Sequence, residues 1–306
     1  AMSEGSSRVL ISLGGNFAAA MPDQARCKQA MHNLELAVHL STKLNRSHLL
    51  IGKASIILPV LGRTERDVQA SGPQAVTVED SMSMVHASRG ALPPASAELR
   101  SEPAIIAGIA QATLPASRVN WAYLVEDYDR IRDLIEQVYP DFKDYNVRIR
   151  HPGGFRLPLP ATERIWKTAS GKAEFHVFPG LHEDPEFTDV LRLTTVRSHD
   201  QYNTTIYGYD DRYRGVFGRR DVLLMHAQDM AERGIEKGAQ LVVQTALPGQ
   251  THRRLVLTAV PHDIARGSVA AYFPEANDLC PMEYHDPDSG IPCYKSVPVT
   301  LEPLAG

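Results

Sequence analysis

A dense row of hydrogen-bonding side chains follows a short apolar run in the second half of the chain. The row extends from Leu193 to Thr205 and reads LTTVRSHDQYNTT, with one guanidinium, one imidazole, and several hydroxyls and amides. Every such side chain can donate or accept a hydrogen bond, so the row suits a large polar ligand that carries phosphates and a heterocycle. A polar surface turn would have a similar composition, and the row alone does not separate the two interpretations.

Two shorter polar segments follow predicted strands in the first half. An apolar run at residues 8–13 stops at Gly14, Gly15 and Asn16. Glycines let the backbone approach a phosphate closely, and Asn16 can hydrogen-bond through both ends of its amide. The alternative is a plain turn, because the full G-x-G-x-x-G fingerprint is missing.

The second polar segment reads STKLNRSH at residues 41–48, directly after the predicted strand 36–40. Its lysine and arginine could hold a phosphate or ribose, whereas a solvated helix start would explain the same residues. Ligands in parallel sheets bind at the carboxyl ends of strands, which is where both segments fall.

The elements around these segments predict an α/β first half. A helix is expected at residues 23–34, because Ala30, Met31 and Leu34 share one face, and a further strand at 54–58. Apolar strands that alternate with helices favour a Rossmann-like parallel sheet covered on both faces. Two more helices are predicted, at 104–113 behind a Ser-Glu-Pro entry and at 125–138 before Pro140.

The second half predicts an all-β domain. A Pro- and Gly-rich stretch at 151–160 separates the two styles of sequence, so we expect an α/β domain at 1–155 and a barrel domain at 156–306. Strand-like runs occupy 173–178, 190–195, 222–225, 240–245, 254–260 and 297–301. One short helix, 228–233, is stopped by Gly234. Six strands at this spacing indicate a closed barrel.

Composition excludes several classes of protein. The 306 residues include 32 Lys and Arg against 36 Asp and Glu, a formal net charge of −4, which gives no electrostatic case for nucleic acid or an anionic membrane. No segment approaches the roughly 18 apolar residues of a membrane span. Cys27, Cys280 and Cys293 form no C-x-x-C pair, so we expect no disulfide framework, zinc site or iron–sulfur site. A reducing, cytoplasmic location fits best.

Several motifs together resemble the dinucleotide-binding C-terminal domain of molybdopterin oxidoreductases. That family has a Thr-x-Arg loop with a polar run, a D-A-x-x-x-G-I-x-x-G-D turn, an Asn-x-Leu and a late Lys. The counterparts here begin at Thr195, Asp229, Asn277 and Lys295, and the chain departs at Ala239, where the family usually has Asp.

The first half is similar to the same family. The segments STKLNRSH, LGRTERDVQ (61–69) and VTVEDSMSMVHASRG (76–90) most resemble formate-dehydrogenase-like alpha subunits of the DMSO reductase family. The resemblance implies a six-stranded barrel of the double-psi type and a bis-molybdopterin guanine dinucleotide that holds molybdenum or tungsten.

The resemblance also implies which residues bind this cofactor. One dinucleotide would contact the first-half segments, and the second would lie along the Thr195 row with help from two residues of the tail. The implied cofactor-binding residues are Gly14, Gly15, Asn16, Thr42, Asn45, His48, Thr195, Arg197, His199, Gln201, Tyr202, Thr204, Asn277 and Lys295. Taken without the resemblance, Asn277 could simply cap a turn and Lys295 could be a solvated strand-edge lysine.

The family's metal ligand has no counterpart in this chain. None of the three cysteines matches that ligand, so we expect neither metal-binding nor catalytic residues here, and iron–sulfur ligands are also absent. The expectation is a C-terminal fragment whose partners are the missing N-terminal portion of the same oxidoreductase and a small-molecule substrate. By itself it would be inactive. The competing hypothesis is a non-catalytic, barrel-containing binding or adaptor module.

Overall fold

The computed structural model describes residues 1–176, 190–204, 206–247, 249 and 252–304. The chain separates into two compact units. Unit 1 contains Ala1–His39, Leu44–Ile57 and His182–Gly306, and unit 2 contains Leu40–Lys43 and Leu58–Leu181. Unit 1 thus combines residues 1–39 with the barrel, whereas the sequence predicts a domain boundary after residue 155. That boundary stays a prediction.

The start of the chain folds as the sequence predicts. Strands β1 (Val9–Leu13), β2 (Leu36–Ser41) and β3 (Ala54–Pro59) form a three-stranded sheet in the order β1-β2-β3. The backbone amide of Leu36 donates to Arg8 O and that of Ala54 donates to Glu35 O, so the strands start side by side and run parallel. The connections carry α1 (Phe17–Ala20), α2 (Gln24–His32) and the 3-10 turn η1 (Arg46–Leu49).

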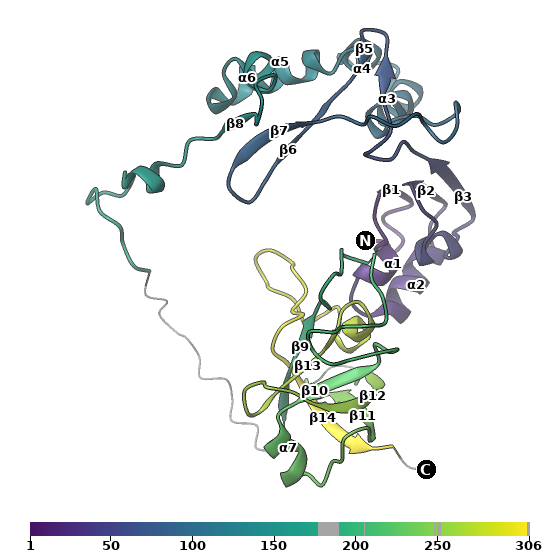
Figure 1. Ribbon diagram of the computed structural model, residues 1–306. Helices are drawn as coiled ribbons and strands as arrows, with labels where there is room; N and C mark the ends of the chain where they lie inside the picture. The colour runs from purple at the N-terminus through teal and green to yellow at the C-terminus, as the bar shows by residue number, and fades with distance from the viewer. Residues whose placement is uncertain (177–189, 205, 248, 250–251, 305–306) are drawn as a thin grey trace. The chain divides into compact units, whose positions relative to one another are not determined.

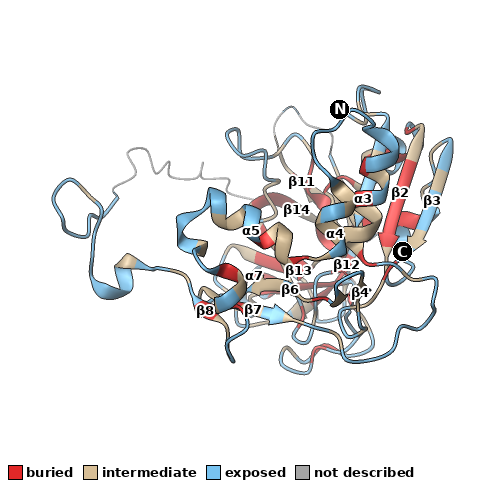
Figure 2. Cartoon of the chain, turned by 90° about the horizontal axis from the view of Figure 1, so that it is seen from above, coloured by how far each residue is buried: buried red, intermediate tan, exposed pale blue. Residues whose placement is uncertain are grey.

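Helix α2 packs against this sheet, and both of its edge strands carry exposed side chains. Helix α2 buries Met31, which packs with Leu34 and Ala37 in a small core, as predicted for its apolar face. Strand β2 is buried along most of its length, next to the largely exposed β3 (Figure 2). On the edge strand β1, Val9, Ile11 and Leu13 are 44–54% exposed. An apolar stripe on a parallel sheet is normally covered.

The rest of unit 1 is a closed six-stranded barrel, which confirms the expected fold class. Its strands are β9 (Leu191–Val196), β10 (Val222–Met225), β11 (Gln240–Thr245), β12 (Arg254–Pro261), β13 (Ser268–Tyr272) and β14 (Val297–Pro303). They close in the order β10-β12-β11-β14-β9-β13, with β10–β12 and β9–β13 parallel and the other pairs antiparallel (Figure 1). Leu193, Leu223, Val243, Leu257 and Val299 lie in the barrel core.

One predicted strand is wrong and one observed strand was not predicted. The described part of the run 173–178 contains no strand, and Phe175 is 97% exposed; residues 177 and 178 lie outside the described chain. The sixth barrel strand is instead β13, with the sequence SVAAY. Alanine has low strand propensity, but here Ala270 and Ala271 are buried between β10 and β9, so barrel packing determines the conformation.

Short elements complete unit 1. Helix α7 (Ala227–Glu232) follows β10 and ends as predicted, with Gly234 in the left-handed conformation at φ +64°. The 3-10 turn η4 (Glu275–Leu279) follows β13. No helix in the described part of the chain has the length and apolar character needed to cross a membrane.

Unit 2 combines small antiparallel sheets with helices. Its strands are β4 (Val68–Gln69), β5 (Gly72–Pro73), β6 (Val76–Glu79), β7 (Met84–Ser88) and β8 (Phe155–Arg156). Its helices are α3 (Glu102–Thr113), α4 (Trp121–Glu126), α5 (Asp129–Val138) and α6 (Tyr145–Arg148), with 3-10 turns η2 (Pro140–Phe142) and η3 (Pro160–Glu163).

The helix predicted at 125–138 is confirmed over Asp129–Val138, but its expected start is wrong, because the chain breaks between α4 and α5. Asp127 is extended, with φ −154° and ψ 113°, and its carboxylate accepts a 3.0 Å hydrogen bond from the backbone of Asp129. A short side chain that binds the backbone two residues on favours a turn over a continuous helix. Helix α3 begins at its Ser101 cap as predicted.

Candidate functional site

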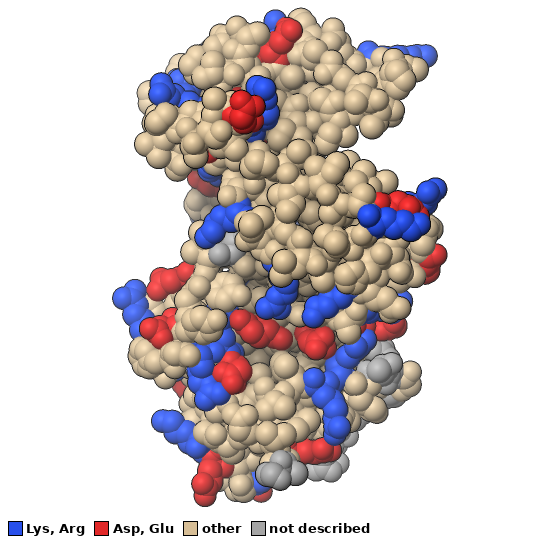
Figure 3. Space-filling view, turned by 90° about the vertical axis from the view of Figure 1, so that its right-hand side faces the viewer, with Lys and Arg blue, Asp and Glu red and all other residues tan. Residues whose placement is uncertain are grey.

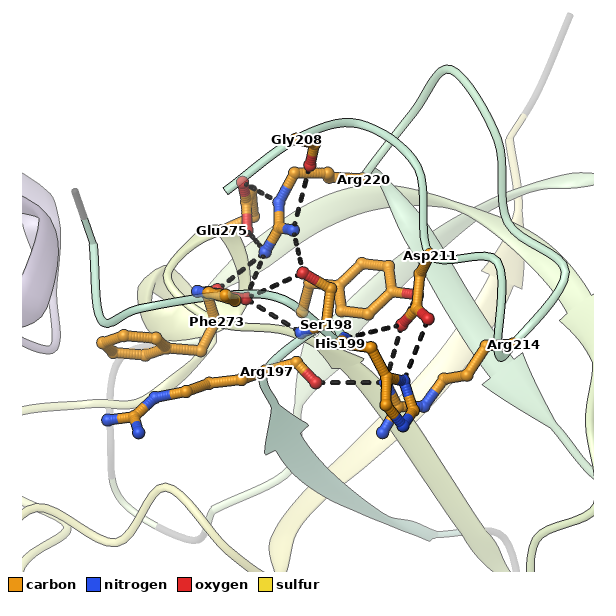
Figure 4. Close-up of polar contacts among 11 residues, drawn as sticks. Arg197, Ser198, His199, Gly208, Asp211, Arg214, Arg220, Phe273 and Glu275 are labelled. Carbon is orange, nitrogen blue, oxygen red and sulfur yellow. Dashed lines mark hydrogen bonds and ion pairs between the residues drawn. The ribbon is translucent and has the colours of Figure 1, made fainter. Parts of the chain in front are cut away.

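The polar row begins in strand β9 and continues into the loop at the end of this barrel strand. Thr195 is 3% exposed in this strand, and its amide donates to Tyr294 O at 3.0 Å. Arg197 follows, and its guanidinium extends away from the other labelled side chains, toward the ring of Phe273 (Figure 4). In the described chain this guanidinium has no hydrogen bond or ion pair; its centre lies 5.7 Å from the centroid of the Phe273 ring.

A buried arginine organises the loop that follows. Arg220 is 4% exposed, and its guanidinium pairs with Glu275 at 2.8 Å and donates to Ser198 Oγ at 2.8 Å and Gln201 Oε1 at 3.0 Å (Figure 4). It also donates to the backbone oxygen of Phe273 at 2.9 Å. The loop conformation therefore depends on one buried cation.

Gln201, a predicted cofactor contact, is engaged within the protein. Its amide nitrogen donates to Asn203 O at 2.8 Å and to Phe273 O at 2.7 Å. Its oxygen accepts from Arg220 and from the backbone and hydroxyl of Ser198. Both amide donors are thus used, so the side chain holds the loop in place and a ligand would have to displace these bonds.

His199 is held by a buried carboxylate. Its Nδ1 lies 3.0 Å from Asp211 Oδ1, and its ring centroid lies 4.3 Å from that of Tyr213. Asp211 also accepts from Arg214 at 2.6 Å and from the Tyr272 hydroxyl at 2.9 Å. Burial alone would raise the pKa of Asp211, but these hydrogen bonds outweigh it and lower the pKa to about 2. The imidazole is 44% exposed and so reaches solvent from a fixed position.

Lys295 lies beside the start of the row. Its Nζ donates to the backbone oxygen of Thr195. Burial lowers the pKa of this ammonium, and the positive charge of Arg197 lowers it further, while Cys280 opposes the shift. The two cations raise each other's electrostatic energy, and an anion bound between them would relieve it.

The first-half segments meet each other and the row. Asn45 Nδ2 donates to Gly15 O at 3.1 Å, and its Oδ1 accepts from the Ser47 amide at 2.9 Å. The Ser47 hydroxyl donates to Asn16 Oδ1 at 3.3 Å, and Asn16 Nδ2 lies 3.5 Å from Thr204 O. Polar segments almost 190 residues apart in sequence are thus adjacent within unit 1.

The other predicted residues lie in different settings. Gly14 has φ +68°, a conformation that favours glycine, and Gly15 has open space where a side chain would start. Tyr202 is 68% exposed and Thr204 is 9% exposed. Thr42 is exposed and belongs to unit 2, unlike the rest of the set. Its proposed role stays a prediction, as do the roles of the others.

Asn277 has a clear structural role. It is fully buried in η4, and its Nδ2 donates to Ala19 O at 3.0 Å and to Ala20 O at 3.1 Å, which ties helix α1 to the barrel. Its Oδ1 has no hydrogen-bond partner in the described residues, and the same holds for His48 Nε2. Buried polar atoms are usually paired, so these two atoms retain hydrogen-bonding capacity that the described residues do not use.

The sequence pointed to neither Arg220 nor Asp211. Both lie in the segment 210–221, which reads DDRYRGVFGRRD, and such a charged loop is typical of solvated surface. Their importance comes mainly from partners 12 to 61 residues away, which no local pattern reveals. On the face shown in Figure 3, basic and acidic side chains are interspersed, in keeping with the formal net charge of −4.

Known proteins match this chain in sequence. Residues 191–298 match the family model of the molydopterin dinucleotide binding domain. The chain is 57% identical over 308 residues to protein YdeP of Escherichia coli, covering 99% of the chain and 41% of that protein. It is 45% identical over 312 residues to the uncharacterized oxidoreductase Rv2900c of Mycobacterium tuberculosis, covering 100% of the chain and 40% of that protein. The chain thus spans about two fifths of the length of these relatives.

A solved structure matches the fold. Acetylene hydratase from Pelobacter acetylenicus superposes with a TM-score of 0.63 at 16% sequence identity, covering 99% of this chain and 45% of that one. At this identity the likeness concerns the fold.

All three cysteines are free, and burial raises the pKa of Cys27 to about 11 and that of Cys280 to about 12. In the described ranges no group of three or more His, Cys, Asp or Glu could hold a metal ion.

Proposed function

We propose that this chain binds the guanine dinucleotide arms of a bis-molybdopterin cofactor as part of a molybdopterin oxidoreductase, because residues 191–298 match the molydopterin dinucleotide binding domain. The cofactor would hold molybdenum or tungsten, and formate-dehydrogenase-like chemistry on a small-molecule substrate is the activity we assign to the whole enzyme. When bound, the cofactor supplies a metal centre that exchanges electrons with the substrate.

The observation that carries this proposal is the unpaired guanidinium of Arg197 beside Lys295. An arginine fork binds phosphate through two parallel hydrogen bonds, and a neighbouring ammonium adds charge. Asp211 and Arg220 fix the loop around these cations and thereby reduce the entropy cost of binding. The pyrophosphate of one arm fits this donor set.

The remaining contacts follow from the same arrangement. His199 would present its exposed imidazole edge to the same arm, and the Asn16–Asn45–His48 segment would contact the other. The unpartnered Nε2 of His48 and Oδ1 of Asn277 supply a donor or acceptor where a polar ligand could bind. Gly14, Gly15, Thr42, Thr195, Gln201, Tyr202 and Thr204 complete the proposed set, with Gln201 acting through the loop.

We further propose that this chain acts as part of a longer oxidoreductase and that the metal ligand comes from outside it. The apolar stripe of Val9, Ile11 and Leu13 on an edge strand suits coverage by further polypeptide. The raised pKa values of Cys27 and Cys280 disfavour the thiolate that a metal requires. Free thiols agree with a cytoplasmic location.

Titration calorimetry with GDP tests the proposal. GDP carries the guanosine and pyrophosphate of one arm, and we expect saturable binding to the chain. Arg197→Ala should weaken this binding roughly ten- to a hundredfold, which corresponds to about 1.5–3 kcal/mol for a charge-assisted hydrogen bond. Arg254→Ala is the matched control, because Arg254 is a 59% exposed arginine of the same barrel, paired with Glu302 at 3.2 Å.

The same experiment separates the competing hypothesis of an adaptor module. An adaptor barrel would not bind GDP, or would bind it equally well after the Arg197 substitution. Formate oxidation by the chain alone, assayed with a redox dye in the presence of molybdenum, should show no turnover. Robust turnover would contradict the proposal that the metal ligand lies elsewhere.

A further inference from the structure

A cavity in unit 2 is independent of the cofactor residues. It has a volume of about 630 Å³, within the roughly 300–1,000 Å³ typical of small-molecule sites. The β6–β7 hairpin, the start of α5 and the loop 149–154 line it. The cofactor proposal uses none of these residues.

The loop 149–154 contains two glycines in a backbone conformation that favours glycine. Gly153 and Gly154 have φ +81° and +69°. A Cβ at Gly154 would overlap the carbonyl oxygen of Val85 in strand β7. The two glycines therefore bring the loop against the hairpin and leave the cavity open beside it.

Three arginines and two aspartates line this cavity. Arg132 is 7% exposed, and it donates to Asp129, to Ala75 O at 2.9 Å and to Asn146 Oδ1 at 2.7 Å. Arg150 binds the second oxygen of Asp129, so two cations share one carboxylate. Burial alone would raise the pKa of Asp129, but these two arginines lower it.

The remaining charges leave an excess of positive charge. The lining holds one more arginine than aspartates, and the arginine left over is Arg89, an exposed side chain with no hydrogen bond or ion pair in the part of the chain that the structure describes. His86 lies 3.0 Å from Asp80, and the ring of His151 has no partner among the same residues. One arginine and one histidine are thus available to a ligand.

We propose that this cavity binds a small organic anion whose phosphate or carboxylate is held by Arg89. A guanidinium can bind either a phosphate or a carboxylate through two parallel hydrogen bonds. The hydroxyl of Thr77 and the imidazole of His151, which also line the cavity, suit a hydrophilic body of the ligand. The site is a second ligand site, distinct in its residues from the proposed dinucleotide site.

Calorimetric titration of the full chain with inorganic phosphate, and separately with succinate, tests this inference. At least one probe should bind, and the tighter one identifies the preferred anion. Arg89→Ala should weaken that binding about tenfold or more. Arg118→Ala, an exposed arginine outside the cavity, should leave it unchanged.

A second variant fills the cavity. Ala87 is an exposed lining residue of strand β7, so Ala87→Trp should fold and should abolish binding. GDP affinity should be the same in all these variants, which separates this inference from the proposed function. Absence of binding by both probes, or binding that Arg89→Ala and Ala87→Trp leave intact, would overturn it.

Discussion

Replacing Arg220 with methionine should destabilise the chain and loosen the polar row. Methionine keeps an apolar stem against the rings of Tyr207 and Tyr272, whose centroids lie 4.3 Å and 4.7 Å from the guanidinium carbon. What is lost is the charge that pairs with Glu275 and the hydrogen bonds to Ser198 and the loop backbone.

The size of the effect follows from burial. Breaking a buried ion pair by removing one partner costs about 3–5 kcal/mol, because the other charge is left uncompensated. The Glu275 side chain is 30% exposed, so water can partly solvate it, and we expect about 3 kcal/mol. That is a large part of a typical unfolding free energy of about 5–15 kcal/mol.

Urea denaturation of the full chain measures this loss, and hydrogen exchange of the 198–203 amides reports the loop. Arg212→Met is the control, since that side chain is 67% exposed and lies 3.7 Å from Asp200, a surface pair worth about 0–1 kcal/mol. Arg220→Met with Glu275→Gln should recover part of the stability. Equal losses for Arg220→Met and Arg212→Met, with unchanged exchange, would show that Arg220 does not hold the loop in place.

Three further substitutions test the glycine loop, a buried ion pair and the role of Lys295. Gly154→Ala should lower the thermal midpoint, because left-handed backbone costs about 1–2 kcal/mol and the Cβ meets Val85 O; an unchanged midpoint would show that the loop adapts. Asp23→Ala should cost about 3–5 kcal/mol in urea denaturation, because Asp23 is fully buried, caps α2 and pairs with Arg253; a loss below about 1 kcal/mol would mean that the pair contributes little. GDP affinity, measured by calorimetry, should fall as the pH rises through the lowered pKa of Lys295, because the ammonium loses its charge. Lys295→Arg stays charged and should remove this fall in affinity. The same pH dependence in both proteins would show that Lys295 does not contact GDP.

The regular elements could be predicted where local pattern and tertiary packing agree. Helix α2 buries Met31 on its predicted apolar face, and it begins at Gln24, one residue after the expected start, with Asp23 as its cap. Strand β13 could not be found, because its alanines carry no strand signal and the barrel alone imposes the conformation. The break at Asp127 depends on one side-chain hydrogen bond, which the helical periodicity hides.

The polar row could be recognised in the sequence, but which of its side chains bind within the protein and which are free for a ligand could not. Arg197 has an unpaired guanidinium that a ligand could bind. The amide nitrogen of Gln201 instead donates hydrogen bonds to the backbone oxygens of Asn203 and Phe273. Arg220 and Asp211 hold the row from the charged segment 210–221, which looks like solvated surface until its partners are known. Side-chain roles of this kind depend on contacts between distant residues, and local composition does not encode them.

We propose that the end of the barrel around Arg197 and Lys295 holds a guanine dinucleotide. The most direct measurement is the change in backbone amide NMR shifts of the isotope-labelled chain as GDP is added. We expect saturable shifts centred on residues 195–204 and on Lys295, and their loss in Arg197→Ala. Shifts confined to other parts of the chain, or no shifts at saturating GDP, would contradict this proposal.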